Sequence, residues 1–339
     1  NFMPFPRNPL QQLIPQRLNA FEKRLKSEIW TSRQPVLVEG GPINDPPVPL
    51  LEAQAQDFAP VHPGEYFAGP GNTWQQRWFR FEMPEASDAE RGRRILFWDS
   101  QGETTVYING APWAGLDVAH GYCVLPDHAC TVWLDTGTYQ TAIWTSHPRF
   151  TVEPYGCRFD GAWICCRNRA VWETYWDFAC LNALLHRLLE KAGWTGAGNC
   201  GHNQPLEKAP ALARHLLVEL DRACDKYETK GLDALAALLQ QLYAKLKAGP
   251  LQGHAALCGH AHLDLVWLWP ETITQRKAVH SFSTVMRIMA QYPEFQFTQS
   301  QPALYDAVKQ YSPELYSEIA QQMEAGRWEA TGGFEVESD

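Results

Sequence analysis

Apolar residues at the start of the chain follow helical spacing. They fall at Leu13, Ile14, Leu18, Phe21 and Leu25. Steps of three and four positions of this kind place side chains on one face of a helix. Residues 39–49 are rich in Gly and Pro and indicate a loop or linker. We therefore expect residues 1–59 to form an N-terminal arm that packs on the region after it.

Residues 60–166 have the pattern of an all-β domain. Short runs of apolar, β-branched and aromatic residues lie at 77–83, 94–99, 105–108, 131–134 and 140–144. Asn109-Gly110 is a strong hairpin-turn signal, because both turn positions favour positive φ. Strands at this spacing predict a β-sandwich of the jelly-roll kind. Such sandwiches often bind sugars, but we give more weight to a role in packing and assembly.

From residue 167 the spacing returns to a helical period. Apolar positions share one face at Phe178, Leu181, Leu184, Leu185 and Leu188, and later at Leu235, Leu238, Leu239 and Leu242. Such stripes are more often core than partner surface. Gly249-Pro250 ends the second helix. We expect a helical linker region over residues 167–250.

The last part, residues 251–339, alternates between strand and helix. Strands are expected at 255–259, at 295–298 and from Trp328, with helices at 275–291 and 302–325, the second broken at Ser312-Pro313. This order predicts a parallel sheet with crossover helices. Three strands make a poor closed barrel, so the domain looks unfinished at Asp339. The chain as a whole is predicted to be a multi-domain α+β protein.

Charge and composition exclude several function classes. The net charge is −9 and no block of Lys and Arg stands out, so a nucleic-acid partner is not expected. No run of 18 apolar residues could span a membrane, and the start lacks a secretory signal pattern. Nine Cys at irregular spacings, with Cys165 and Cys166 adjacent, suit a reduced cytoplasmic protein.

Candidate chemistry is concentrated in the segment 259–270, where a predicted strand gives way to its loop. Residues two apart on a strand point the same way, so His260, His262 and Asp264 project to one side if the strand continues. An imidazole and a carboxylate at this spacing can chelate one divalent ion, Zn²⁺ before Co²⁺ or Mn²⁺. Two other interpretations stay open at this point: a structural His hydrogen-bonded to Asp264, and a metal-assisted deacetylase or phosphoesterase.

The residues around this triplet carry a family resemblance. The run Gly-His-Ala-His-Leu-Asp-Leu-Val-Trp-Leu-Trp-Pro at 259–270 resembles the opening catalytic motif of the glycoside hydrolase family 38 α-mannosidases, especially their cytoplasmic and bacterial branch. Residues 281–287, 293–301 and 326–339 resemble the family's first helix, second strand and third strand, in that order. The resemblance is specific over 254–339 and moderate over 60–250.

The resemblance implies a fold and a set of site residues. The family carries its metal on a (β/α)7 barrel, of which residues 251–339 would be the start. His262 and Asp264 match two of its zinc ligands, and Trp267 matches an aromatic residue that lies against the bound mannose. An aromatic face is a sound partner for sugar C–H groups. Asp339 matches an acidic position near the substrate.

The resemblance also covers three further residues near the site. His260 fits a role in orienting a metal ligand from behind. Gln299 and Gln301 lie near the rim of the site in the resemblance, where a pure packing role has at least equal weight.

The implied activity is metal-dependent, retaining hydrolysis of terminal α-linked mannose from oligosaccharides or glycans, with Zn²⁺, or alternatively Co²⁺, as the cofactor. The family's nucleophile, its later His ligand and its general acid fall beyond Asp339, so this chain alone is expected to be inactive. The family often forms oligomers, which allows a homo-oligomer of unspecified size. Two alternatives remain: a non-catalytic carbohydrate-binding or assembly module on the sandwich, and another metal-dependent hydrolase.

Overall fold

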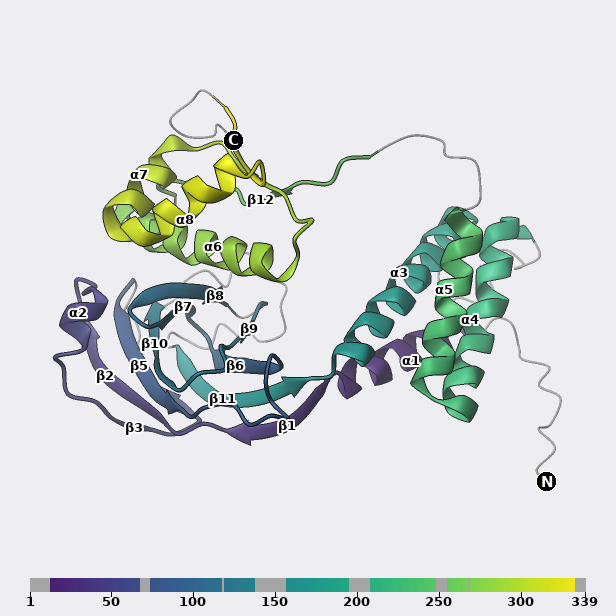
Figure 1. Ribbon diagram of the computed structural model, residues 1–339, viewed down its shortest axis with the longest axis horizontal. Coiled ribbons are helices and arrows are strands. Elements are labelled where there is room, and N and C mark those ends of the chain that lie inside the picture. The colour runs from purple at the N-terminus through teal and green to yellow at the C-terminus, as the bar shows by residue number, and fades with distance from the viewer. Residues whose placement is uncertain are drawn as a thin grey trace. The chain divides into compact units, whose positions relative to one another are not determined.

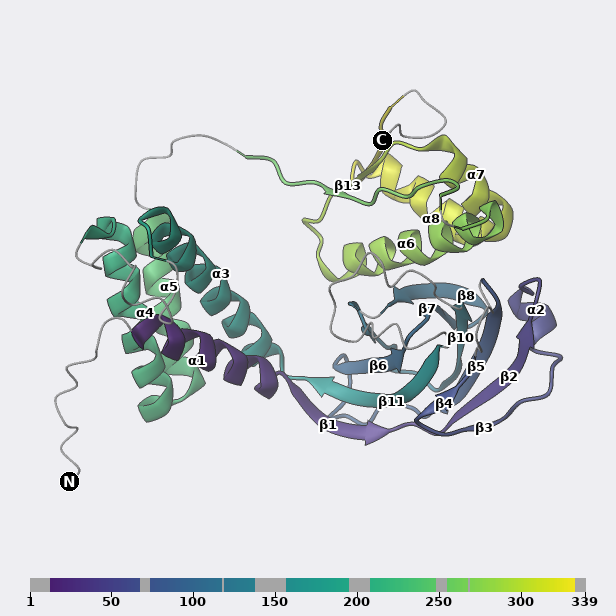
Figure 2. The ribbon, with the colours of Figure 1, turned by 180° about the vertical axis from the view of Figure 1, so that it is seen from behind.

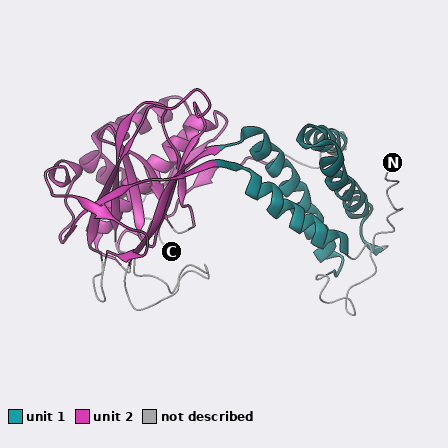
Figure 3. Cartoon of the chain, turned by 90° about the horizontal axis from the view of Figure 1, so that it is seen from below, with its two compact units in different colours: residues 1–31, 167–254 teal, residues 32–166, 255–339 magenta. Residues whose placement is uncertain are grey.

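The computed structural model describes residues 13–67, 74–117, 119–137, 157–194, 208–247, 255–267 and 269–332. The chain divides into two compact units (Figure 3). One combines residues 1–31 with 167–254, and the other combines 32–166 with 255–339. Both units are therefore assembled from segments that are distant in the sequence.

The first unit is a helical bundle. Its helices are α1 (Ile14–Glu28), α3 (Arg169–Lys191), α4 (Ala211–Lys230) and α5 (Leu232–Lys247). The α1 stripe is buried, and Phe21 lies edge-on to Phe178 of α3 with ring centroids 5.1 Å apart. The expectation that residues 1–59 form one arm on the following domain is wrong, because α1 buries its apolar face against α3 and α4 instead.

The predicted helices at 167–250 are confirmed, but the sequence reading did not single out α4. Three of its buried positions are the small residues Ala213, Ala223 and Cys224. Small side chains weaken the apolar stripe on which a helix prediction depends. In the described part of the chain, no helix has the length and apolar character needed to cross a bilayer.

The second unit contains a β-sandwich, as predicted. Its five-stranded sheet comprises β1 (Trp30–Pro35), β11 (Arg158–Arg167), β6 (Arg94–Ser100) and β9 (Tyr122–Val124), with β4 (Glu65–Tyr66) paired to β11. Its six-stranded sheet runs in the order β3 (Ala59–Val61), β2 (Val38–Asn44), β5 (Gln76–Met83), β10 (Cys130–Gly137), β7 (Glu103–Ile108) and β8 (Ala111–Leu116). Both sheets bury their inner faces in one apolar core. The short helix α2 (Leu50–Ala53) follows β2.

Details of the sandwich both confirm and correct the sequence reading. Asn109 and Gly110 form the predicted turn between β7 and β8, with φ values of 53° and 82°. The expected strand at 140–144 lies outside the described residues. The sandwich begins before residue 60, because β2 and β3 belong to its six-stranded sheet.

Gly40 shows why the Gly- and Pro-rich segment 39–49 contains part of a strand rather than only a loop. Strand β2 pairs with β5, and the register shifts between Gly40 and Ile43. A Cβ at Gly40 would lie 2.7 Å from Cγ2 of Val61 and 2.9 Å from a guanidinium nitrogen of Arg77. Glycine is therefore needed where two neighbouring strands approach closely, a common use of Gly within a sheet.

Residues 255–332 form the second part of this unit. A parallel sheet runs in the order β12 (Gly259–His260), β13 (Phe297–Gln299) and β14 (Trp328–Ala330). The connecting helices are α6 (Glu271–Gln291), α7 (Pro302–Tyr311) and α8 (Pro313–Glu324). The predicted parallel order and the helix break at Ser312-Pro313 are confirmed, while a (β/α)7 barrel stays a prediction. The strand expected at 255–259 is wrong in its bounds, because the exposed residues 255–258 form no strand and β12 begins at Gly259.

Helix α6 connects the two parts of the second unit. It lies along β8, the end strand of the six-stranded sheet, and both views of the ribbon show this (Figures 1 and 2). The backbone N–H of Gly115 in β8 donates a 2.8 Å hydrogen bond to Oγ1 of Thr284 in α6. The helix that follows the candidate site is thus packed directly on the sandwich.

Candidate functional site

The candidate site begins where β12 ends. His260 is the last residue of this strand, and the chain leaves regular structure at Ala261. The side chains of His262 and Asp264 meet, with His262 Nε2 3.3 Å from Asp264 Oδ1. Both remain partly accessible to solvent. An imidazole and a carboxylate therefore lie side by side just after the end of a parallel strand, although the strand does not continue through them as the sequence argument assumed.

Two buried glutamines hold the backbone of this segment. Gln299, at the end of β13, donates from Nε2 to the carbonyl oxygen of Ala261 at 2.6 Å. Gln301 donates from Nε2 to the carbonyl oxygen of Leu263 at 2.7 Å and accepts the Leu263 N–H at 3.4 Å. The side-chain amides thus replace the ladder of hydrogen bonds that β12 and β13 no longer provide.

Gln299 is itself fixed by hydrogen bonds with neighbouring residues. The Oε1 atom of Gln299 accepts the backbone N–H of Ser300 at 2.8 Å. The Tyr305 hydroxyl donates to the backbone oxygen of Gln299 at 3.0 Å and accepts from the Trp328 indole N–H at 2.8 Å. Burial raises the pKa of Tyr305 to about 12, so this hydroxyl keeps its proton and can donate. The backbone of the His262–Asp264 segment therefore rests on a connected polar network.

The loop continues into two tryptophans that differ in exposure. Trp267 is 47% exposed, whereas Trp269 is half-buried. Their rings meet edge to face, with centroids 5.8 Å apart. The Trp269 indole N–H donates to Oγ1 of Thr274 at 3.0 Å, and that hydroxyl donates to the carbonyl oxygen of Leu265. The first turn of α6 thus fixes the loop that carries the accessible Trp267 ring.

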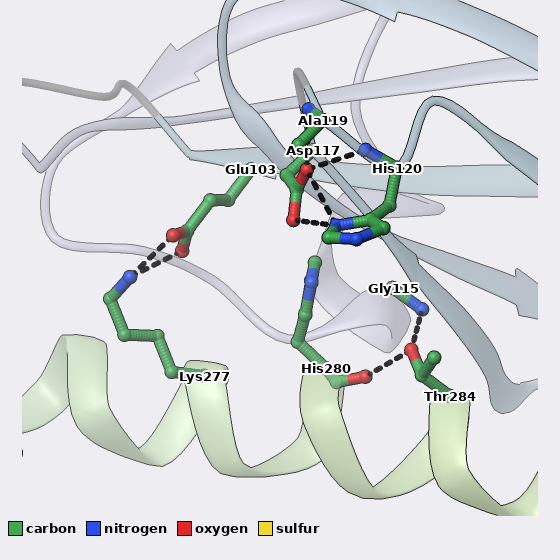
Figure 4. Close-up of polar contacts among 8 residues, drawn as sticks. All are labelled: Glu103, Gly115, Asp117, Ala119, His120, Lys277, His280 and Thr284. Atoms are coloured by element: carbon green, nitrogen blue, oxygen red, sulfur yellow. Dashed lines mark hydrogen bonds and ion pairs between the residues drawn. The ribbon is translucent and has the colours of Figure 1, made fainter. Parts of the chain in front are cut away.

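Helix α6 also brings two cations to the sandwich. Lys277 Nζ lies 2.5 and 2.6 Å from the carboxylate oxygens of Glu103 in β7 (Figure 4). Arg276, one position earlier, pairs with Asp135 of β10, and its Nε lies 3.3 Å from Asp135 Oδ2. Opposite charges partly removed from water attract more strongly than they would in bulk water. Two ion pairs therefore join α6 to neighbouring strands.

Two histidines lie close to the Gly115 contact (Figure 4). Burial lowers the pKa of His280 on α6, although nearby carboxylates oppose this shift. Burial alone would raise the pKa of Asp117, but hydrogen bonds from the side chain and backbone of His120 and the backbone of Ala119 lower it to about 2. At neutral pH a neutral, half-buried His280 and an ionised Asp117 therefore lie near this contact.

The donor set fits part of a metal site. A neutral imidazole nitrogen and a carboxylate oxygen are suitable ligands for a divalent transition metal, and the contact between His262 and Asp264 already brings these two donors together. Within the residues that the structure describes, no group of three or more His, Cys, Asp and Glu could enclose an ion. A catalytic metal usually has three protein ligands, so at least one more would have to be added to this pair.

The predicted site residues differ in their contacts and in their exposure to solvent. His262 and Asp264 meet, and Trp267 lies exposed three positions later. His260 is exposed at the strand end, and Asp339 lies outside the described residues. Gln299 and Gln301 are buried supports of the backbone, rather than residues on an open rim.

Thr274 and Lys277 were not anticipated. Their partners, such as Glu103 for Lys277, depend on tertiary packing that no local pattern indicates.

Comparisons with known proteins agree with the sequence resemblance. Residues 252–339 match the N-terminal domain of the family 38 glycosyl hydrolases, and residues 34–133 match the jelly-roll domain of α-mannosidases. "Alpha-mannosidase 2C1" of Homo sapiens is 28% identical over 333 residues, which is 93% of this chain and 30% of the human protein. "Alpha-mannosidase G" of Dictyostelium discoideum is 46% identical over 81 residues, 24% of this chain and 8% of that protein.

One further relative and one solved structure were also compared. The "Alpha-mannosidase" of Saccharomyces cerevisiae is 33% identical over 82 residues, 24% of this chain and 8% of its own length. Among solved structures, a β-glucuronidase of Ruminococcus gnavus aligns over 41% of this chain and 29% of its own, at 11% identity and a TM-score of 0.26. The chain spans about a third or less of the length of each of these α-mannosidases.

Proposed function

We propose that this chain is the N-terminal part of a metal-dependent retaining α-mannosidase of glycoside hydrolase family 38, an enzyme that removes terminal α-linked mannose. The observation that carries the proposal is the contact between His262 and Asp264. It lies at the carboxyl end of a parallel strand, inside the segment that matches the family 38 domain. Ligands collect at such strand ends in α/β folds.

His262 and Asp264 would contribute the imidazole nitrogen and carboxylate oxygen of the metal site. We propose Zn²⁺ as the ion, with Co²⁺ as the alternative, because mixed nitrogen and oxygen donors suit both. When bound, the metal would polarise and orient hydroxyl groups of the sugar. The Asp264 carboxylate would balance part of the positive charge, and the Gln301 contacts to Leu263 would keep the two ligands in place between turnovers.

Trp267 would provide the apolar face of the sugar subsite. Its ring is accessible at 47% exposure while its edge contact with Trp269 restrains it. A sugar ring has C–H groups that pack on an aromatic face, which combines apolar burial with weak C–H attraction. Asp339 is proposed as a further substrate contact on the basis of the sequence resemblance alone.

The remaining chemistry is proposed to come from residues after Asp339. In a retaining mechanism a carboxylate attacks the anomeric carbon while an acid protonates the leaving oxygen, and water then releases the sugar from the enzyme. The two carboxyl groups lie about 5–5.5 Å apart in such enzymes. The nucleophile, the acid and the missing metal ligands would complete the site around His262, Asp264 and Trp267.

We place the protein in the reducing cytoplasm. The pKa of the Cys123 thiol and that of the Cys224 thiol are both raised to about 12, chiefly by burial. Such thiols stay protonated at neutral pH and are poor nucleophiles. This behaviour agrees with the cysteine pattern of the sequence, which suits packing better than a disulfide framework.

Release of nitrophenol from p-nitrophenyl α-D-mannopyranoside by the full-length gene product tests the proposal. We expect release that a chelator abolishes and that added Zn²⁺ or Co²⁺ restores, with none from the 1–339 chain run alongside. No release with any metal would reject the α-mannosidase proposal. Release by the 1–339 chain alone would show that the nucleophile has been misplaced. Chelator-sensitive cleavage of esters or amides, without cleavage of mannosides, would favour another hydrolase.

A further inference from the structure

Lys277 occupies a position between the sandwich and the sugar-binding loop. Its ammonium nitrogen contacts both carboxylate oxygens of Glu103, at 2.5 and 2.6 Å, and lies 4.5 Å from the centre of the Trp269 ring. The side chain is only 11% exposed. A cation shielded from water interacts more strongly with both a carboxylate and an aromatic face. Lys277 therefore binds two partners from different parts of the fold at once.

The contacts of Trp269 extend this restraint to the loop that carries Trp267. The Trp269 indole N–H is bound by Thr274, and the Thr274 hydroxyl is bound to the Leu265 carbonyl. Its ring edge contacts Trp267. Each link in this series is a directional contact, and Thr274 is almost fully buried. A displacement of Trp269 would consequently move both the backbone at Leu265 and the ring of Trp267.

We propose that Lys277 is a positioning residue for the mannoside subsite, and that Glu103 in the sandwich fixes it there. This inference rests on the proposed function, because it assumes that Trp267 receives the sugar. It also gives the sandwich a second role: besides packing, strand β7 sets the geometry of a subsite that lies on the other part of the unit. The glutamine network restrains the loop at Ala261 and Leu263, and Lys277 restrains it at Trp269.

Arg276 offers a matched control on the same helix. It also forms an ion pair with the sandwich, but its partner Asp135 is bound by Gln76 of β5 at 2.7 Å. The Asp135 side chain is 7% exposed, whereas that of Glu103 is 25% exposed. A buried charge that loses its partner is more costly than one that water can reach. Arg276→Met should thus destabilise the fold more than Lys277→Met, while leaving the Lys277–Trp269 contact in place.

The test uses the full-length enzyme with Lys277→Met and Arg276→Met in parallel. We expect Lys277→Met to raise KM for p-nitrophenyl α-D-mannopyranoside about tenfold with little change in kcat, because uniform sugar binding is lost. Metal content should stay at the wild-type level. Arg276→Met should keep the wild-type KM and show the larger fall in Tm. Equal KM values in the two variants would overturn the proposal.

A charge-swapped variant distinguishes a role of the ion pair alone from a role of the cation on the Trp269 ring. Combining Glu103→Lys with Lys277→Glu keeps opposite charges across the contact but removes the cation from the Trp269 face. If the ion pair alone matters, the swap should restore the wild-type KM, which would contradict the proposal. We expect KM to stay raised in the swapped variant.

Amide hydrogen exchange provides a readout that does not depend on activity. Exchange of a peptide covering residues 261–269 should rise about tenfold in Lys277→Met and stay unchanged in Arg276→Met. Unchanged exchange in Lys277→Met would refute the positioning role even if the enzyme is a mannosidase. If the wild-type enzyme cleaves no α-mannoside, the proposed function fails, and the exchange measurement still decides whether Lys277 positions the loop.

Discussion

The core of the sandwich and the loop of the candidate site differ in where they place a tryptophan ring. In the sandwich core, Trp78 is 1% exposed and Phe79 is fully buried. In the segment that carries the candidate site, Trp267 is 47% exposed while the amides of Gln299 and Gln301 are buried. Apolar side chains are expected inside and amides outside, so an inverted arrangement is the informative one. This difference is consistent with the proposed sugar subsite at Trp267.

The buried amides also differ from the sandwich core in what they contribute. Burying an amide is costly unless it is hydrogen-bonded, and Gln301 meets this condition by bonding both backbone groups of Leu263. A sandwich residue such as Phe79 contributes apolar contact, which has no required direction. Directional bonds hold a backbone in one place, as a ligand-bearing loop requires.

The strongest way to break this comparison is Asp264→Ala in the full-length protein. We expect loss of bound metal together with at least about a thousandfold loss of activity, because a metal supplies several kcal/mol of charge stabilisation. Elemental analysis and mannoside hydrolysis measure the two effects. Asp306→Ala, an exposed carboxylate on α7, is the control and should change neither. Full activity with metal retained in Asp264→Ala would remove this residue from the site.

Gln301→Ala tests whether the buried amide serves the metal ligands. The variant leaves both Leu263 backbone groups without their side-chain partner, which costs about 1–3 kcal/mol of stability. Metal affinity should fall about 10- to 100-fold, as it does when groups supporting ligands are lost. Metal titration and thermal unfolding measure these effects. Gln296→Ala, exposed just before β13, should be neutral; equal effects at both positions would show that Gln301 has no special role.

Trp267→Ala sharpens the contrast between exposed and buried aromatics. Removal of the ring should raise KM for a mannoside by about 3- to 10-fold, equivalent to the 0.5–1.5 kcal/mol of an aromatic contact. Stability should change little because the ring is half exposed. Trp176 on α3 has the same exposure of 47% and serves as a matched control. If Trp176→Ala raises KM as much as Trp267→Ala does, the effect is not local to the subsite.

The smallest predicted effect concerns pH and His280. Burial holds its pKa below the ordinary value of about 6.5, so the folded protein keeps it neutral while the unfolded chain takes up a proton. The contribution of neutral His280 to the free energy of unfolding is therefore fully present above about pH 6.5. It declines as the pH falls below that value, by at most about 1.4 kcal/mol per pH unit for one proton. Asp117, with a pKa of about 2, does not titrate in this range.

His280→Gln should flatten this decline of Tm between about pH 6.5 and 5, whatever its own effect on stability. The exposed His128→Gln serves as the control and should keep the wild-type slope. An unchanged slope in His280→Gln would mean that another group causes the dependence.

Local patterns predicted the elements that have strong periodicity and clear end signals. Helix α6, the break between α7 and α8 and the Asn109-Gly110 turn were all expected from spacing and from Gly or Pro. The His262–Asp264 contact could also be predicted from the sequence, because side chains two positions apart can meet without help from the rest of the fold.

Long-range contacts were not predictable in the same way. Gln301 reaches Leu263 only because the parallel pairing of β12 and β13 brings the two segments together. Lys277 and Glu103 are 174 positions apart. The sequence predicts a loop over residues 39–49, because a Gly next to a Pro usually ends regular structure. Only the neighbouring strand at Val61 explains why Gly40 lies in a sheet.

Anomalous diffraction at the zinc edge, from crystals of the full-length protein grown with Zn²⁺, tests the central claim most directly. The account predicts a peak about 2.0–2.2 Å from both a ring nitrogen of His262 and a carboxylate oxygen of Asp264. A peak at other residues in an active enzyme, with His262 and Asp264 still in contact with each other alone, would contradict it.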